Sequence, residues 1–386
     1  MNQADQLVII PVAGRRQMSL FLQLPRRLYA GLPGYVPPLD MEQKDLLHPA
    51  KSGFFGHGRA QYFLAMRAGR PVGRISAHVD DLAIETLGEK IGFFGALDAI
   101  DDLAVVSALL DAACAWLRAQ GMPLARGPMT LNSNGELGMM VDGQHAPPMI
   151  AMPWHPHWLP AMIEACGFAK AMDFLAYQME IGPAAEQAHL VPASLRMGEG
   201  KLGDVTTRGM RRRQIAEDGE ILRRLYNEAW RNNWGFVPLT ADEMRGMIAQ
   251  MKPILKSEHL VLIEHKGEPA AVALVVPNLY DVAGDLGGAP SPLGWIKLGG
   301  RLLRHRFHSA RVILLGVSSK VEGTALGAML PALAITELMR RGRSLPYRMV
   351  EMGWILETNM PVRRLIERLA PEPCKRYRVY DRSLTD

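Results

Sequence analysis

A short glycine-containing segment that follows an apolar run is the strongest sign of chemistry in the sequence. The run Val312–Val317 has the composition of a fully buried strand, and Ser318-Ser319 ends it. The next residues, Lys320–Gly327, lead into a long apolar segment typical of a helix. Because the first N–H groups of a helix lack internal partners and carry partial positive charge, this order of elements favours phosphate binding. The segment matches neither a Walker A loop nor G-x-G-x-x-G, and an ordinary strand-to-helix turn is the alternative.

Carboxylates on the next predicted strand are candidates for a general base. The strand is expected over Tyr347–Leu356, and period two places Glu351, Glu357 and Asn359 on one face while the strand lasts. A partly desolvated glutamate has a raised pKa, which suits a proton acceptor near neutral pH. The alternative is that these carboxylates form salt bridges with the many nearby arginines.

Two polar segments are candidates for substrate binding. Residues Tyr226–Pro238 combine aromatic and amide side chains in a predicted loop between helices, and Gly127–Glu136 is polar and rich in turn residues. A packed satellite core is the alternative for the first segment, and Asx turns that satisfy their own backbone are the alternative for the second. The candidate residues are Asn232, Asn233, Trp234 and Phe236 in the first segment and Asn132 and Asn134 in the second.

Histidine and cysteine spacing gives no support for a metal site. His155 and His157 stand one residue apart, with no further carboxylate or cysteine nearby, so no metal is expected. The cysteines Cys114, Cys166 and Cys374 are far apart and odd in number, which argues against a disulfide framework and fits a reducing compartment.

Composition indicates a globular protein of two domains or three small ones. The chain has 386 residues, of which 48% are apolar and 22% charged. No signal peptide or membrane-spanning segment is expected, so we expect a cytoplasmic protein. The net charge of +5 mildly favours anionic partners, but no nucleic acid is expected among them.

A basic and apolar insertion suggests contact with a lipid surface. Residues Leu293–His308 interleave tryptophan, leucine and phenylalanine with lysine, arginine and histidine, and contain no acidic residue. That composition suits an amphipathic helix on the surface of an anionic membrane, although Gly299-Gly300 disfavours a helix. A lid or surface helix that packs on its own domain is the alternative.

The expected elements occur in the same order twice. Each half has a hairpin with glycine at the turn, then strand, helix, strand, helix and strand, and each hairpin is preceded by a strand and helical segments. In the first half they are Gln61–Arg67, Pro71–Val79, Lys90–Leu97, Leu103–Ala119, Pro123–Met129, Pro156–Ala165 and Phe174–Met179; in the second, His259–His265, Pro269–Val276, Ala310–Ser319, Thr324–Arg341, Tyr347–Leu356, Pro361–Leu369 and Lys375–Tyr380. We therefore expect an α/β protein with a mixed sheet, built from domains 1–182 and 204–386 and a linker over 183–203.

The phosphate loop and the repeated order resemble the GNAT (Gcn5-related N-acetyltransferase) superfamily. Lys320-x-x-Gly323-x-Ala325 is similar to the pyrophosphate motif (Arg/Gln)-x-x-Gly-x-(Gly/Ala), with lysine in the first place. The resemblance implies tandem GNAT domains, with an acyl-coenzyme A held by the second. It implies that coenzyme A contacts Val317, Ser318, Lys320, Val321, Gly323, Thr324 and Ala325, with backbone N–H groups near Val317 and Ser318 as oxyanion donors.

Two expected features of that superfamily are missing. The strand of the first half leads into Asp98–Asp102, which has no glycine and three carboxylates that would repel a pyrophosphate, so the first half is expected to shape the acceptor site or an interface instead. The tyrosine that serves many GNAT enzymes as general acid is replaced by Ile366, with Tyr377 and Tyr380 as weak substitutes.

Four further motifs resemble a bacterial GNAT-like group that includes the ceramide synthases. They are Asn233–Pro238, Trp354–Asn359, Gly127–Met129 and Tyr35–Pro38. The resemblance implies N-acyl transfer from a long-chain acyl-coenzyme A to a sphingoid base, by a protein peripheral to the cytoplasmic face of the membrane. The alternatives are a tandem-GNAT transferase with another acceptor, such as an amino acid or a peptidoglycan precursor, and a binding module without activity.

Overall fold

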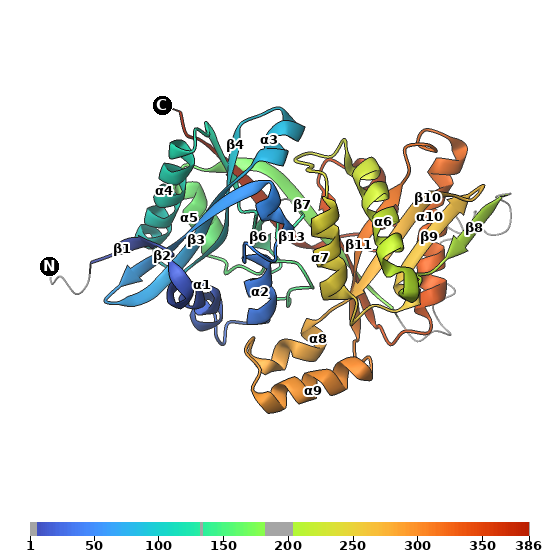
Figure 1. Ribbon diagram of the computed structural model, residues 1–386, viewed down its shortest axis with the longest axis horizontal. Helices are drawn as coiled ribbons and strands as arrows, with labels where there is room; N and C mark the ends of the chain where they lie inside the picture. The colour runs from blue at the N-terminus through green and yellow to red at the C-terminus, as the bar shows by residue number, and fades with distance from the viewer. Residues whose placement is uncertain (1–5, 132–133, 182–203, 386) are drawn as a thin grey trace. The chain divides into compact units, whose positions relative to one another are not determined.

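The computed structural model describes residues 6–131, 134–181 and 204–385 and divides into two compact units (Figure 1). Unit 1 contains Met1–Leu175, Ala283–Ser291 and Lys375–Asp386. Unit 2 contains Ala176–Val282 and Pro292–Cys374. The expected linker over 183–203 lies outside the described residues, so the domain limits drawn from the sequence stay predictions.

Unit 1 is built on a sheet in which the strands pair in the order β1-β2-β3-β4-β5-β13-β7, with β6 beside β13. Neighbours from β1 to β4 are antiparallel, whereas β4 and β5 are parallel. The strands are β1 (Val8–Pro11), β2 (Gly58–Arg67), β3 (Arg70–Asp80), β4 (Ile91–Ala99), β5 (Leu124–Gly127), β6 (Met139–Asp142), β7 (Ala169–Glu180) and β13 (Pro373–Ser383).

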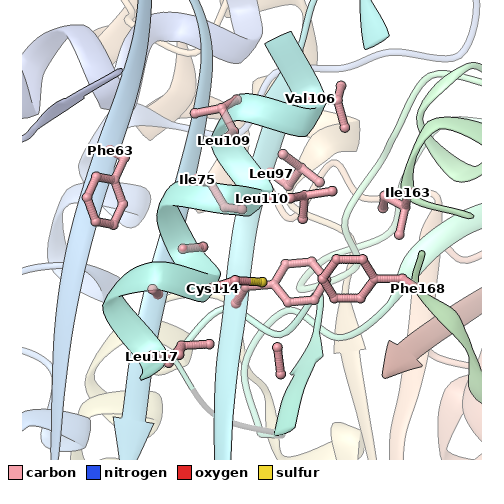
Figure 2. Close-up of a cluster of buried hydrophobic side chains, with 14 of the residues drawn as sticks. Phe63, Ile75, Leu97, Val106, Leu109, Leu110, Cys114, Leu117, Ile163 and Phe168 are labelled. Carbon is pink, nitrogen blue, oxygen red and sulfur yellow. The ribbon is translucent and has the colours of Figure 1, made fainter. Parts of the chain in front are cut away.

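A large core cluster of unit 1 forms around one helix, and a second one includes Phe21 and Leu24 of α1. The α-helices of this unit are α1 (Gly14–Leu28), α2 (Asp40–Leu46), α3 (Asp81–Leu87), α4 (Leu103–Ala119) and α5 (Leu159–Ala165). Figure 2 shows Val106, Leu110 and Cys114 of α4 among side chains from the sheet and from α5, in a cluster of fully buried residues. Asp102 accepts a hydrogen bond from the Ala104 amide and so caps the start of α4.

Unit 2 repeats this plan with the strand order β7-β12-β11-β10-β9-β8. Its β11 and β12 are the parallel pair, which corresponds to β4 and β5 of unit 1. The remaining elements are β8 (Val205–Arg208), β9 (Leu260–His265), β10 (Glu268–Pro277), β11 (Ser309–Val317), β12 (Met349–Leu356), α6 (Ile215–Trp230), α7 (Ala241–Met251), α8 (Tyr280–Ala283), α9 (Pro292–Leu303), α10 (Ala325–Gly342) and α11 (Met360–Ile366).

Helices cover both faces of the unit 2 sheet. Leu330 and Leu333 of α10 pack with a buried cluster that Leu315 and Val317 of β11 border. Gly316 lies between those two residues, so its Cα faces the opposite side, where an added Cβ would meet the Trp230 ring of α6 at 2.6 Å. The expected mixed α/β sheet and its tandem repeat are confirmed.

The structure adds short elements that the pattern did not predict. Helices α2 and α3 and strand β6 have seven, seven and four residues, too few for a clear apolar period. The strand expected over Pro123–Met129 is shorter and ends at Gly127, because Pro128 has no N–H to offer a ladder. Helix α9 runs through the Gly299-Gly300 pair.

The last strand of the chain belongs to the first unit. β13 pairs antiparallel with β5, from Tyr380 with Gly127 to Ser383 with Leu124. Strand β7 in turn begins in unit 1 and ends in unit 2. The order of elements follows the expected repeat, but the last strand completes the sheet of unit 1.

Four buried histidines are held neutral by their surroundings. Burial lowers the pKa of His78 to about 3 and that of His155 to about 4 in unit 1. In unit 2, burial lowers the pKa of His259 to about 3 and that of His305 to about 4. The Lys256 amide donates to Nδ1 of His259, so Nε2 of His259 carries the proton of the neutral ring. That Nε2 faces the Tyr347 hydroxyl. The same hydroxyl lies 3.2 Å from His305 Nε2.

The stability of the protein is expected to fall as pH drops below about 6.5. Histidines of the unfolded chain take up protons there, whereas these four stay neutral in the fold until pH nears 3 to 4. At pH 5.5 each contributes a loss of about 1 to 2 kcal/mol. Urea unfolding at pH 7.5 and 5.5 measures the effect. His78→Gln should flatten the pH dependence and His157→Gln, at an exposed position, should not; equal slopes for both variants would contradict the assignment.

Candidate active site

The site is organised by two parallel strands that stop pairing partway along their length. β11 and β12 pair from Ser309 with Met349 to Val312 with Met352. Both strands then continue, to Val317 and Leu356, beyond the last of these pairs. Their diverging ends leave backbone groups that no longer bond across from one strand to the other.

The backbone of β11 presents Val317 on the side of this divergence. The Ser318 amide donates to the Ala270 carbonyl of β10 at 2.8 Å, so Ser318 takes part in the antiparallel ladder. Bonded and non-bonded pairs alternate in such a ladder, so the amide of Val317 points the other way, toward the β12 side. Of the two expected oxyanion donors, Val317 has the suitable direction and the amide of Ser318 is already engaged.

The loop after β11 leaves several backbone amides unused. Thr324 caps α10 by accepting from the Gly327 amide at 3.0 Å, and the Val321 amide donates to the Ser318 carbonyl at 3.1 Å. Gly323 has φ +74°, a left-handed conformation that favours glycine. Within the described residues, no hydrogen bond is made by the backbone amides of Glu322, Gly323, Ala325 and Leu326. A row of such donors at the start of an 18-residue helix is suited to bind phosphate oxygens.

A glutamate that the sequence did not single out holds the end of β11. Glu228 of α6 accepts from the Ser318 hydroxyl at 2.8 Å, and from the amide and the hydroxyl of Ser319 at 3.2 Å each. Burial raises the pKa of Glu228, but these hydrogen bonds outweigh it and hold the pKa below its usual value. Glu228 is therefore ionised at neutral pH and fixes the first turn of the loop. Its place in a helix, 90 residues from Ser318, gave no sequence signal.

The aromatic segment predicted to bind the acceptor lies beside the same loop. Tyr226 and Trp230 stack with ring centroids 5.0 Å apart, and Trp230 packs on Gly316 near the end of β11. Phe236 is buried against Tyr226, which makes it part of a small core, as the alternative proposed. Asn232 is exposed, and Asn233 and Trp234 are half-buried. The segment thus combines a packed base with partly accessible amide and indole groups.

The three candidate catalytic residues occupy different environments. Glu351 is fully buried in the paired part of β12, opposite buried Arg311. Glu357 is half-buried just after β12, and its carbonyl accepts from Arg363 at 2.8 Å. Asn359 caps α11 by accepting from the Val362 amide at 3.3 Å. Only Glu351 lies on the strand itself, because β12 ends at Leu356.

Hydroxyl groups near α11 do not restore the missing tyrosine of the helix. Ile366 is buried, as expected for an apolar residue. Tyr177 of β7 donates to Glu367, which follows α11, at 2.9 Å. Tyr377 and Tyr380, the weak substitutes, belong to unit 1, where Tyr380 donates to Glu164 at 3.2 Å.

In unit 1 the corresponding divergence is filled by the chain itself. β4 and β5 pair only from Ile91 with Leu124 to Phe93 with Arg126. The Met129 amide then donates to the Phe94 carbonyl at 2.7 Å. A Cβ added at Gly95 would lie 2.0 Å from the Met129 carbonyl oxygen, so the two backbones are in direct contact.

The carboxylates after β4 also have structural roles. Asp98 forms a buried ion pair with Arg74 at 2.7 Å, and Asp102 caps α4 while pairing with Arg67 at 2.8 Å. Neither arrangement resembles the phosphate loop of unit 2. That the first half does not bind coenzyme A stays a prediction.

A half-buried polar group in unit 1 surrounds the second candidate segment. Glu136 accepts from Gln43 at 2.9 Å and from Thr130 at 3.2 Å, and burial raises its pKa. Burial, reinforced by the nearby Glu136 charge, raises the pKa of Glu42 to about 7. Asn134 is half-buried next to this group, whereas Asn132 lies outside the described residues.

Over the part of the chain that the structure describes, no three His, Cys, Asp or Glu side chains gather in a way that could hold a metal ion. His155 instead accepts a hydrogen bond from the Met140 amide at 3.2 Å, and His157 is exposed.

Gly327→Ala is expected to weaken acyl-coenzyme A binding by about tenfold, because an added Cβ would lie 2.1 Å from the Val321 carbonyl oxygen and would displace the loop. Titration calorimetry with octanoyl-coenzyme A measures the affinity. Gly342→Ala is the control, since this glycine ends the same helix with nothing within 4 Å of its added Cβ. Equal affinity in the two variants would remove the loop from the binding site.

Comparison with known proteins identifies relatives along the whole chain, although no family model matches it. The chain is 36% identical over 370 residues to Protein YghO of Escherichia coli strain K12, which covers 96% of this chain and 94% of that protein. It is 36% identical over 381 residues to the bacterial ceramide synthase of Caulobacter vibrioides, with 98% of each chain covered.

Solved structures show the same fold at lower identity. A tandem GNAT protein from the clavulanic acid biosynthesis pathway matches 99% of both chains with a TM-score of 0.59 at 14% identity. The glucosamine N-acetyltransferase region of a fungal β-N-acetylglucosaminidase matches 98% of this chain and 38% of its own, with a TM-score of 0.57 at 13% identity. With its tandem GNAT fold, the chain belongs to the family that includes bacterial ceramide synthase and YghO.

Proposed function

We propose that this protein transfers a long-chain acyl group from acyl-coenzyme A to the amine of a sphingoid base. Family membership and the tandem GNAT fold make the chain an N-acyltransferase. The observation that carries the choice of donor is the loop of unit 2 between β11 and α10, in which the amides of Glu322, Gly323, Ala325 and Leu326 make no hydrogen bond within the described residues. The choice of acceptor rests on the similarity to the ceramide synthase.

The diverging strands suit the pantetheine arm and the thioester. With the pyrophosphate at the start of α10, the arm would run along β11 on the side where β12 has separated. Leu315 and Val317 direct their amides and carbonyls to that side, by the alternation that Ser318 fixes and that holds as far as the register shift at Ile313. The Val317 amide would then donate to the oxyanion that forms when the amine attacks the thioester carbonyl.

The amine must reach the carbonyl neutral and lose a proton as the new amide bond forms. We assign Glu357 as the acceptor of this proton, because Glu357 is half-buried just after the diverging part of β12. Glu351, by contrast, is fully buried in the paired part of that strand. Collapse of the tetrahedral intermediate breaks the carbon–sulfur bond and releases the coenzyme A thiolate. Asn232, Asn233 and Trp234 remain the proposed contacts for the acceptor in unit 2. The prediction that Asn134 of unit 1 binds a polar group stays a separate one.

Helix α9 is proposed to bring the protein to an anionic lipid surface, where a long-chain acceptor would be found. Of the eight exposed large hydrophobic side chains in the described parts of the chain, α9 carries four. Leu293, Ile296 and Leu303 share one face of the helix and are 78%, 73% and 90% exposed. Lys297 and Arg304 lie next to that face, and the sequence has no acidic residue from Leu286 to Val321. Within the described ranges, no helix is both long and apolar enough to cross a bilayer.

Titration with acetyl-, octanoyl- and palmitoyl-coenzyme A should give affinities that rise with chain length, because a longer chain buries more apolar surface. Palmitoyl-coenzyme A and sphinganine should then yield the N-acyl product by mass spectrometry. If no thioester binds, the donor assignment fails. If the donor binds but a different amine is acylated, the protein is an acyltransferase with another acceptor; binding without any transfer would leave a module without activity.

Glu357→Gln is expected to lower kcat by about a hundredfold with little change in KM, since the amide cannot accept the proton. Glu351→Gln serves as the comparison. A normal rate for Glu357→Gln would exclude this residue from proton transfer.

The membrane assignment predicts salt-sensitive binding to vesicles that contain phosphatidylglycerol, measured by co-sedimentation. Leu293→Asp combined with Ile296→Asp should abolish the binding. Leu103→Asp is the matched control, because this leucine is also exposed but lies at the start of α4. Vesicle binding that survives the double substitution would argue against α9 as the contact surface.

A further inference from the structure

We propose that Arg231 is a second cation of the phosphate loop and binds a phosphate of the nucleotide part of coenzyme A. The inference rests on the proposed function, since it assumes that the loop binds coenzyme A. It adds a residue outside the loop motif: Arg231 follows α6, 91 residues away from its partner in the loop.

The guanidinium of Arg231 is fixed directly beside the loop. Its Nη1 donates to the Glu228 carbonyl at 2.5 Å, which ties the side chain to the end of α6. Its Nη2 lies 2.6 Å from a carboxylate oxygen of Glu322. Glu322 precedes Gly323 and is one of the residues with an unused backbone amide. A planar guanidinium at this place can form paired hydrogen bonds to phosphate oxygens.

The charges around the loop explain why one lysine does not suffice. Glu228 faces Ser318-Ser319, Glu322 is part of the loop, and Glu268 pairs with Lys320 at 3.1 Å. Three carboxylates therefore stand near the place proposed for an anionic group. Lys320 alone leaves this neighbourhood negative, whereas Lys320 and Arg231 together offset most of the negative charge.

Both cations pair with exposed carboxylates. The Arg231 and Glu322 side chains are 42% and 58% exposed, and those of Lys320 and Glu268 are both 68% exposed. Exposed ion pairs contribute little to stability, so exchanging a carboxylate partner for a phosphate costs little. Glu322 thus serves to orient Arg231 and to release it toward the phosphate.

The test measures binding of octanoyl-coenzyme A and of octanoyl-pantetheine, which carries the same thioester without the nucleotide. Arg231→Ala should lower the affinity for octanoyl-coenzyme A by about tenfold and leave the affinity for octanoyl-pantetheine unchanged. Arg231→Lys should lower the affinity for octanoyl-coenzyme A less than Arg231→Ala does. The control is Arg224→Ala, because Arg224 is exposed on the same face of α6 about two turns earlier. Octanoyl-dephospho-coenzyme A, which lacks the ribose 3′-phosphate, assigns the contact. If its affinity is as sensitive to Arg231→Ala as that of octanoyl-coenzyme A, Arg231 binds the pyrophosphate; if it is insensitive, Arg231 binds the 3′-phosphate.

Glu322→Gln separates this role from a purely structural one. If Arg231 binds phosphate, Glu322→Gln should keep or increase the affinity for octanoyl-coenzyme A. If Arg231 only holds Glu322 and the loop in place, Glu322→Gln should lower it as much as Arg231→Ala does, and the proposal falls. The proposal also falls if Arg231→Ala changes the affinity for neither ligand, or changes both affinities equally. Failure of the proposed donor is a different result: the wild-type protein would then bind octanoyl-coenzyme A no better than octanoyl-pantetheine.

Discussion

The early end of pairing between β11 and β12 is the constraint on which the candidate site depends. A parallel sheet normally satisfies its backbone from strand to strand, and four pairs are made before the two strands diverge. Arg311 supports the point of divergence, since its Nε donates to the Gly353 carbonyl at 3.0 Å and its guanidinium lies 4.5 Å from the centre of the Trp354 ring. The direction of the Val317 amide and the position of the loop before α10 both follow from it.

The two units share one arrangement of strands but differ where the parallel pair diverges. In unit 1 the chain closes the divergence with its own backbone, through Met129 on Phe94 and the close approach at Gly95. In unit 2 the strand instead ends in serines held by Glu228 and is followed by a loop rich in unused amides. Both copies of the fold therefore keep the sheet, whereas only the second has the loop that we propose to bind coenzyme A.

Local patterns predicted the elements, and tertiary contacts decided the rest. The helix Leu103–Ala119 was expected with the limits that the structure gives, because its apolar period and its flanking Asp102 and Gly121 are local signals. The strand, loop and helix that we propose to bind phosphate were expected for the same reason. The contacts of Glu228 and Arg231 with this loop were missed, because they form only when packing of α6 on Gly316 brings these residues to a segment about 90 residues away. The placement of β13 in unit 1 also depends on long-range pairing that periodicity does not encode.

The position of β13 has a consequence for how the chain can be made and divided. This strand ends at Ser383, close to the end of the sequence, yet it lies between β5 and β7 in the sheet of unit 1. During synthesis, β5 has no β13 to pair with until the segments of unit 2 that lie between the two strands have been made. A fragment cut after the first half would expose that edge permanently. The sheet of unit 1 is therefore completed only after the sequence of unit 2 has been made, although the two units look like separate domains in the sequence.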